Sequence, residues 1–356
     1  MMTISERLQE LLRQVLREAF GDTLSDLEPD LTVATQAQFG HYQCNNALKL
    51  AKELKQKPRD IAKHIADGLK AADQQQMIQK CEIAGPGFIN VTLLSSFLEK
   101  EVERMLQDAH FGVPRPKRVQ RIVVEFSSPN IAKELHVGHL RSTIIGDALA
   151  RLFEFLGHDV LRLNHIGDWG TQFGMLIAYI KQFEPTFFEE KKTADLAQLM
   201  QWYKESKKLF DLDPEFKKRS QLEVVRLQGG EVSSLEAWEM ICDISRRAFK
   251  EIYQLLDVQI EERGESFYNP YLPEVVADLE RKGLITVSEG AKCVFLDGFV
   301  SREGTPLPMI VQKSDGGYNY DTTDMAAMRH RTEQEKADRI IIVTDAGQAL
   351  HFQMIV

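Results

Sequence analysis

The sequence lacks an excess of basic residues, closely spaced cysteines and long hydrophobic runs. Its 356 residues include 53 acidic and 44 basic side chains, for a formal net charge of -9, so any nucleic-acid contact has to come from local patches. The four cysteines contain no C-x-x-C pair; neither a zinc site nor a disulfide framework is signalled, and a reducing cytoplasm fits best. No secretory signal precedes the amphipathic start, and no apolar stretch approaches the ~20 residues of a membrane span.

What is present is sufficient for folded cores. A hydrophobic content of 43% over this length predicts two or three globular domains. Within the first 110 residues, apolar spacing predicts helices over 4–20 and 42–54 and a third from Pro58 to Leu69, followed by strand pieces at 81–84 and 88–93. This part is expected to be an independent α/β module.

The centre of the chain carries the pattern of a strand, a helix and a second strand. Apolar residues 122–124, closed by Glu125 and Phe126, predict a buried strand, and the apolar spacing of 137–156 predicts a helix ended by Gly157. A second strand is expected at 160–163. Short joints between these elements predict a parallel sheet with a right-handed crossover.

Two histidines and a glycine lie where that helix begins. A helix N-terminus favours anions, the imidazoles of His136 and His139 can donate hydrogen bonds to phosphate oxygens, and Gly138 lets a ligand approach the backbone. Taken alone, the same spacing also fits a helix cap with a packing histidine, or zinc.

The residues around these histidines resemble a known family. The segments 125–133, 136–139 (HVGH), 139–147 and 164–170 (NHIGDWG) are similar to the class I aminoacyl-tRNA synthetases and, within that class, to the arginyl-tRNA synthetases, whose HIGH signature HVGH matches. The resemblance implies an α/β fold: a Rossmann-like parallel sheet of the HIGH-type nucleotidyltransferase class, split by a helical insertion and preceded by an N-terminal α/β tRNA-binding domain.

The same resemblance implies a division of the chain. Residues 1–113 would be the additional domain that binds the tRNA corner, 114–120 a linker, 121–185 the first half of the catalytic fold, and 186–300 a mostly helical connective insertion. Residues 301–356 would be the second half of that fold. The pattern itself predicts a charged helical region over 187–256, interrupted at Gly229-Gly230, strands at 293–296 and 309–312, and a buried strand at 339–344.

Residue by residue, the resemblance implies three sets of contacts. ATP would be bound by His136, Gly138 and His139, and Lys133 would help His136 and His139 in catalysis at the phosphates. Arginine would be bound by eight residues: Glu125, Ser128, Asn130, His136, Glu265, Tyr320, Asp324 and Gln348. Carboxylates suit the guanidinium end because two oxygens accept its paired N–H donors side by side. By composition alone, Asp324 also fits a helix cap.

Contacts with tRNA are expected in the first domain. The segment 84–90 resembles the family, which implies that Phe88 and Asn90 stack on and read a base of a tRNA loop. The alternative is that Phe88 packs in the core and Asn90 lies in a turn. The dense basic residues between Lys49 and Lys63 fit either a solvated helix face or a phosphate-binding surface.

The implied activity is that of an arginine–tRNA ligase. It would use ATP with Mg²⁺ held by phosphates rather than by a protein cage, its partners would be L-arginine and tRNA(Arg), and a cytoplasmic monomer is expected. The apolar end at 350–356 predicts that the chain stops within its catalytic fold. Two alternatives are a fragment that only binds substrate and RNA, and a different HIGH-type nucleotidyltransferase.

Overall fold

The computed structural model describes residues 2–21, 28–190, 194–301 and 304–356. The chain divides into two compact units, one up to Lys117 and the other from Arg118 to Val356. No described helix is long and apolar enough to cross a bilayer.

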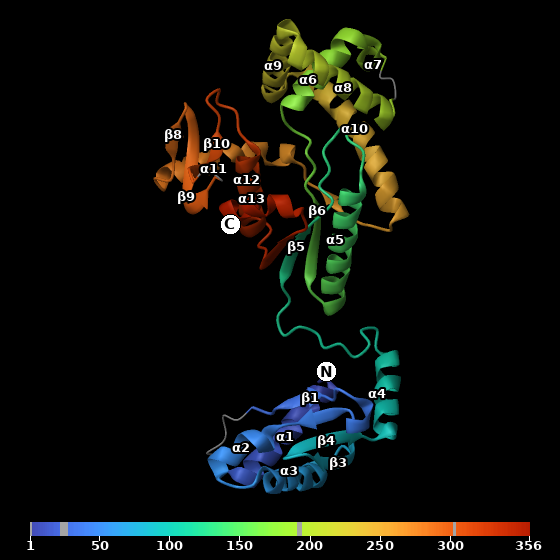
Figure 1. Cartoon of the computed structure of the whole chain (residues 1–356). Helices are drawn as coiled ribbons and strands as arrows, with labels where there is room; N and C mark the ends of the chain where they lie inside the picture. Colours follow the sequence, from blue (N-terminus) through green and yellow to red (C-terminus); the bar gives the residue numbers. More distant parts are fainter. Residues whose placement is uncertain (1, 22–27, 191–193, 302–303) are drawn as a thin grey trace. The chain divides into compact units, whose positions relative to one another are not determined.

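The first unit is an antiparallel sheet with helices packed on it (Figure 1). Its strand order is β1-β2-β4-β3, and its core joins the apolar face of the first helix to the third helix and the central strand. Helix α1 begins at a capping box between Thr3 and Glu6. The described elements of the first unit are α1 (Ile4–Phe20), β1 (Leu31–Val33), η2 (Ala37–Phe39), β2 (Tyr42–Cys44), α2 (Asn46–Leu54), α3 (Pro58–Ala72), β3 (Ile78–Ala84), β4 (Phe88–Leu93) and α4 (Ser95–Gln107).

The helix predicted over 42–54 is wrong in its first turn. Strand β2 occupies Tyr42–Cys44 and pairs with β4, with Tyr42 opposite Val91. The helix therefore starts at Asn46. Long-range strand pairing overrides a helical pattern there, and that pairing is invisible in a local window.

The second unit is built on a parallel sheet in the order β11-β5-β6-β7. Helix α5 lies along β5 and β6 (Figure 1) and links them, which confirms the predicted strand, helix and strand. It ends at Gly157, whose φ of 94° is left-handed. The elements are β5 (Arg121–Glu125), α5 (Val137–Leu156), β6 (Asp159–Asn164), β7 (Glu261–Glu262) and β11 (Arg339–Ile342).

A helical layer and a small antiparallel sheet complete this unit. Helices α6 (Thr171–Phe183), α7 (Pro185–Glu189), α8 (Leu196–Leu212), α9 (Pro214–Gln228) and α10 (Val232–Leu255) share one core. The predicted break at Gly229-Gly230 separates α9 from α10. The following elements are η3 (Glu265–Tyr271), α11 (Leu272–Arg281), β8 (Thr286–Ser288), β9 (Ala291–Val300), β10 (Pro306–Gln312), α12 (Tyr320–Glu333), η4 (Ala346–Gln348) and α13 (Ala349–Ile355).

Two details of the C-terminal part differ from the simplest reading of the sequence. Strands β9 and β10 form one antiparallel hairpin, so the division expected between residues 300 and 301 falls inside it. Strand β11, expected to be buried, lies at the edge of the described sheet, and its residues are only partly buried. An isoleucine run alone does not tell an edge strand from a central one.

Candidate active site

The chain reverses direction across the sheet at β5. From β5 it moves to β6 and β7 on one side, and it returns to β11 on the other side. In open parallel sheets, ligands bind beyond the carboxyl ends of the strands at such a reversal. Glu125 ends β5, and the segment after it carries Ser128 to His139. Glu265 follows β7 and Gln348 follows β11, whereas Tyr320 and Asp324 open α12, which follows β10.

The two histidines after β5 form a capping box at the start of α5. The Nδ1 atom of His136 accepts from the backbone N–H of Gly138 at 3.1 Å, and that of His139 accepts from the backbone N–H of His136 at 3.2 Å. In the neutral rings the proton is therefore on Nε2, which remains a donor for a ligand. Burial, with His136 and Lys133 nearby, lowers the pKa of His139 and favours this neutral form.

Glu125 ends strand β5 inside the protein. It forms an ion pair with Arg331 of α12, which is only 2% exposed, and it accepts a hydrogen bond from Ser128 Oγ at 3.4 Å. The carboxylate predicted to hold the amino group of arginine is thus already opposite a buried guanidinium. Any ammonium group that it binds would share the carboxylate with Arg331.

The backbone between Glu125 and the helix is strained. Ser127, Ser128 and Ala132 have φ values of 70°, 46° and 60°, a region that L-residues rarely occupy. Hydrogen bonds from Ser128 N to Asn164 Oδ1 at 2.9 Å and between Ser127 Oγ and Tyr253 Oη at 2.7 Å hold the loop in place. Such strain, over-determined by its surroundings, is typical of functional loops.

Asp324 lies between two imidazoles. Its Oδ1 is 3.4 Å from Nε2 of His165, and its Oδ2 is 2.7 Å from Nε2 of His351. Although burial works against ionisation, these hydrogen bonds lower the pKa of Asp324 to about 2. The carboxylate stays charged and offers acceptors to a cation; it is not a helix cap, because the cap position of α12 is Asn319.

Glu265 lies close to Asp324, but the two carboxyls differ in the pH at which they ionise. Burial raises the pKa of Glu265 to about 7, with Asp168 and Asp324 adding to the rise and His165 opposing it. Asp168 is itself buried and accepts from Ser266 Oγ at 2.6 Å. A cation entering this group of carboxyls would find one permanently charged and one able to become charged.

The remaining residues that were predicted to bind substrates are more exposed to solvent. Tyr320 is 54% exposed, its ring centroid 4.9 Å from that of His351. Asn130, Lys133 and Gln348 are exposed, and the side chain of Asn130 lies against the backbone of Gly167. The described residues show no hydrogen bond or ion pair that joins the His136–His139 pair to the carboxyl cluster.

Sequence reasoning missed four side chains that complete the site: His165, Asp321, Arg331 and His351. The first two lie within segments that were singled out, in NHIGDWG and beside Asp324. No local signal marks the other two, because their partners lie far away in the sequence.

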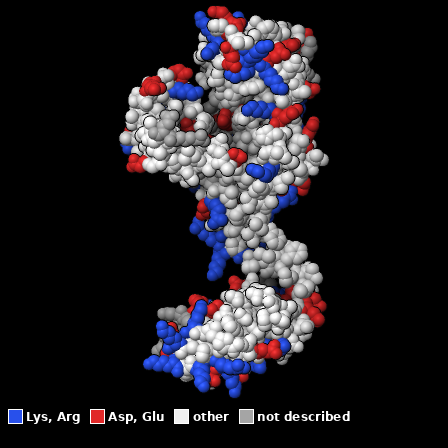
Figure 2. Space-filling view, viewed as in Figure 1, with Lys and Arg blue, Asp and Glu red and all other residues white. Residues whose placement is uncertain are grey.

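The tRNA residues predicted in the first unit lie on strand β4. Phe88 is half-buried, and Asn90 is buried, with its Oδ1 accepting from Gln43 Nε2 at 3.0 Å. Asn90 is thus in a strand rather than a turn. Figure 2 shows basic side chains gathered over α2 and α3, and the exposed ones include Lys49, Lys52, Lys55, Lys57, Arg59 and Lys63.

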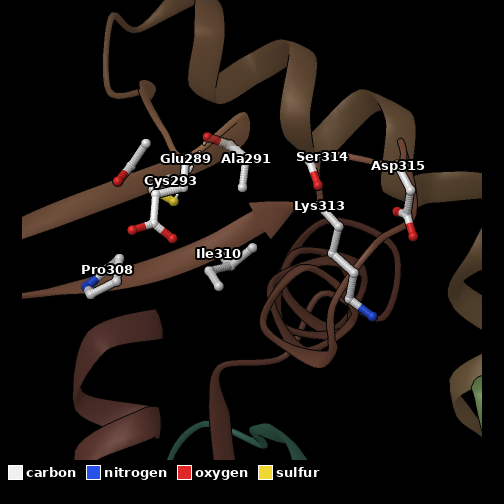
Figure 3. Close-up of a pocket in the computed structure, with 9 residues that line it drawn as sticks. Glu289, Ala291, Cys293, Pro308, Ile310, Lys313, Ser314 and Asp315 are labelled. Carbon is white, nitrogen blue, oxygen red and sulfur yellow. Dashed lines mark hydrogen bonds between the residues drawn. The ribbon is translucent and has the colours of Figure 1, made fainter.

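A separate pocket of about 450 Å³ opens on the antiparallel sheet (Figure 3). It is lined from β8, β9, β10 and the turns that follow β8 and β10, with Cys293, Ile310 and Lys313 among its residues. None of the residues that were predicted to bind arginine, ATP or tRNA lines this pocket.

Comparison with known proteins shows the family to which the chain is similar. A family described as the catalytic domain of class I tRNA synthetases (R) matches residues 101–356, and one described as the arginyl-tRNA synthetase N-terminal domain matches 6–93. Curated arginine–tRNA ligases from Protochlamydia amoebophila and from a Nostoc species are 58% and 54% identical over 100% and 99% of the chain. The chain spans 61% and 59% of their lengths.

Solved structures show the same likeness. The arginyl-tRNA synthetase of Plasmodium falciparum is 34% identical with a TM-score of 0.76, over 100% of this chain and 61% of that one. That of Thermus thermophilus, at 23% identity and a TM-score of 0.61 over 93% of this chain and 53% of that one, shows the fold alone. The chain therefore belongs to the arginyl-tRNA synthetase family of the class I aminoacyl-tRNA synthetases.

Proposed function

We propose that this chain is the tRNA-binding and substrate-activating part of an arginine–tRNA ligase. The observation that carries the proposal is the group of carboxyls around Asp324 at the carboxyl ends of the parallel strands, close to the point where strand order reverses. A guanidinium is a planar cation with paired donors, which such carboxylates accept side by side.

Arginine would lie with its guanidinium at Asp324, Glu265 and Tyr320. Its α-amino group would reach Glu125, Ser128 and Asn130 after β5, and Gln348 would form the wall between the two ends. Support comes from the positions of these residues, all of which follow β5, β7 or β11 or open α12. An α-amino group and a guanidinium need separate acceptors, which this arrangement provides.

ATP would lie at the N-terminus of α5. The free Nε2–H donors of His136 and His139 and the backbone at Gly138 would meet its phosphates, with Lys133 adding a charge. A carboxylate oxygen of arginine would form a bond to the α-phosphorus as the bond to pyrophosphate breaks. A ribose hydroxyl of tRNA(Arg) would then attack the acyl carbon and release AMP.

These steps rest on positioning and on stabilising charge that develops on the phosphate. Mg²⁺ would arrive with ATP and bridge its phosphate oxygens. We propose that the first unit serves tRNA, that 121–185 and the C-terminal segment serve catalysis, and that the helical region from 186 is the insertion; because β9 and β10 form one hairpin, the insertion does not end between residues 300 and 301. Four buried free cysteines suit a reducing cytoplasm, where we expect the protein to work as a monomer.

A second candidate follows from the length of the chain. Because it spans about three-fifths of its relatives, it could bind arginine, ATP and tRNA without turning them over. One assay distinguishes the two candidate functions: the arginine-dependent exchange of labelled pyrophosphate into ATP, measured with tRNA(Arg) present.

Exchange by the 356-residue chain, lost in Asp324→Asn and kept in Asp297→Asn, is the result expected of the ligase. Asp297 is the matched control because it is exposed on β9 and lies outside the carboxyl cluster. Arginine binding without exchange would select the binding fragment. Exchange that is unaffected by Asp324→Asn would contradict the assigned pocket.

A further inference from the structure

The ring of His351 connects two carboxylates on the neighbouring helix. Its Nδ1 is 3.1 Å from Oδ1 of Asp321, and its Nε2 is 2.7 Å from Oδ2 of Asp324. Both aspartates lie on the first turns of α12, whereas His351 comes from α13. Since carboxylates only accept hydrogen bonds, a ring that bonds to both carries a proton on each nitrogen.

We propose that His351 is a positioning residue for guanidinium recognition: by bridging Asp321 and Asp324, it fixes the carboxylate of Asp324 in the orientation that receives the substrate. The proposal rests on the proposed function and extends it to a residue that does not itself touch arginine. An ionised carboxylate has about four lone-pair sites. His351 and His165 use one on each oxygen, which leaves one on each oxygen for a two-pronged donor.

Loss of the bridge would act on both orientation and charge. Asp321 is 7% exposed, and among the residues that the structure describes its one further side-chain donor is the amide of Asn319, at 3.1 Å. Without an imidazolium between them, two close carboxylates repel, and one of them gains a proton more easily. A protonated Asp324 would no longer accept two N–H groups from a guanidinium.

The surroundings of His351 favour its charged form. Burial lowers its pKa, but hydrogen bonds to Asp321 and Asp324 outweigh this effect and raise the pKa of His351 to about 9. The other groups that face the ring are Tyr320, whose centroid is 4.9 Å away, and Phe352, at 5.1 Å. His165 lies behind Asp324, on the opposite oxygen. Among these, only the two aspartates supply negative charge directly to the ring.

The first test is calorimetric titration of the 356-residue chain with L-arginine. His351→Ala is expected to weaken binding about ten- to a hundredfold, the range of a lost charge-assisted hydrogen bond. Added imidazole should restore part of the affinity by filling the space. His158→Ala is the matched control, since His158 accepts from the backbone N–H of Gln120 and lies outside this cluster. A folded His351→Ala chain with wild-type affinity would overturn the proposal.

A second measurement does not need arginine. The titration of the His351 Cε1–H resonance, assigned by its absence from His351→Gln, should have a midpoint well above that of an ordinary histidine, and Asp321→Asn should lower it. Asp321→Asn should also weaken arginine binding, so the test stands even where His351→Ala does not fold.

A midpoint at the ordinary histidine value in the wild-type chain would overturn the bridge and with it the proposal. So would an Asp321→Asn chain with a lowered midpoint and unchanged arginine affinity. A raised midpoint in a chain that binds no arginine would establish the bridge but overturn the proposed function and the role of the bridge in recognition.

Discussion

At the scale of single residues, the site is a set of charges whose states depend on burial. Asp324 is held ionised, while burial raises the pKa of Glu265 to about 7. Because the folded pKa of Glu265 lies above its ordinary value, its contribution to stability is greatest below that ordinary value and falls as the pH rises through 7. Glu265→Gln should therefore stabilise the protein above pH 7 in thermal unfolding.

The same carboxyl predicts proton release. A guanidinium beside Glu265 favours its ionised form, so arginine binding near pH 7 should release a proton from it. The binding enthalpy should then depend on the ionisation enthalpy of the buffer, and Glu265→Gln should remove that dependence. An equal dependence in wild type and variant would place the proton elsewhere.

Removing one partner of the ion pair between Glu125 and Arg331 should lower the free energy of unfolding substantially. Arg331→Met leaves a buried carboxylate without its partner, with an expected loss of about 3–5 kcal/mol in the free energy of unfolding. Arg329→Met, on the same helix, removes an exposed pair with Glu333 and should cost about 0.5 kcal/mol or less. Urea unfolding of both variants measures the difference; similar losses would show that burial of the pair does not matter.

The sequence identified Glu125, Glu265 and Asp324 but not the partners that determine their states. Family resemblance marks all three carboxylates, and Glu125 also lies at the end of a predicted strand. Arg331 acquires its role only when α12 places it opposite Glu125 of β5, and His351 only when α13 packs against α12. An isolated arginine in a helix is ordinarily a surface residue, so its burial could not be anticipated.

At the scale of elements, helix α5 combines a structural cap with a ligand-binding end. His136→Ala should lose the cap and cost about 0.5–2 kcal/mol. His136→Asn keeps a capping side chain but lacks the outward Nε2–H, so it should preserve the melting temperature and still weaken ATP binding. Thermal unfolding and calorimetry with ATP separate the two effects. An asparagine variant that binds ATP normally would limit His136 to capping.

Helix α5 also shows that apolar periodicity in a sequence predicts the limits of a helix but not which of its faces is buried. Its limits, 137–156, were predicted correctly from apolar spacing. The side chains that produced the spacing, however, include several exposed ones: Val137, Leu140, Ile144, Ile145 and Leu152. The face toward the sheet holds Gly146, where an added Cβ would lie 2.2 Å from the Phe126 ring. Periodicity identifies a helix, but close packing against a strand can select a face of small residues.

At the scale of the whole molecule, the first unit has its own core and its own basic surface. Its proposed contact with tRNA should depend on charge, so Lys52→Glu and Lys63→Glu should each weaken tRNA(Arg) binding, most strongly at low salt. Each lost phosphate contact should reduce the slope of log affinity against log salt by about 1. Lys100→Glu, on α4, is the matched control. Equal effects of all three would indicate general repulsion rather than a site over α2 and α3.

The measurement that tests the account most directly is calorimetric binding of L-arginine to the 356-residue chain, with L-citrulline and L-lysine as controls. The carboxyl cluster predicts saturable binding of arginine alone, because citrulline lacks the charge and lysine lacks the paired planar donors. Asp324→Asn should abolish that binding in a folded chain. Equal binding of citrulline, or full arginine affinity in Asp324→Asn, would contradict the claim that these carboxylates recognise a guanidinium.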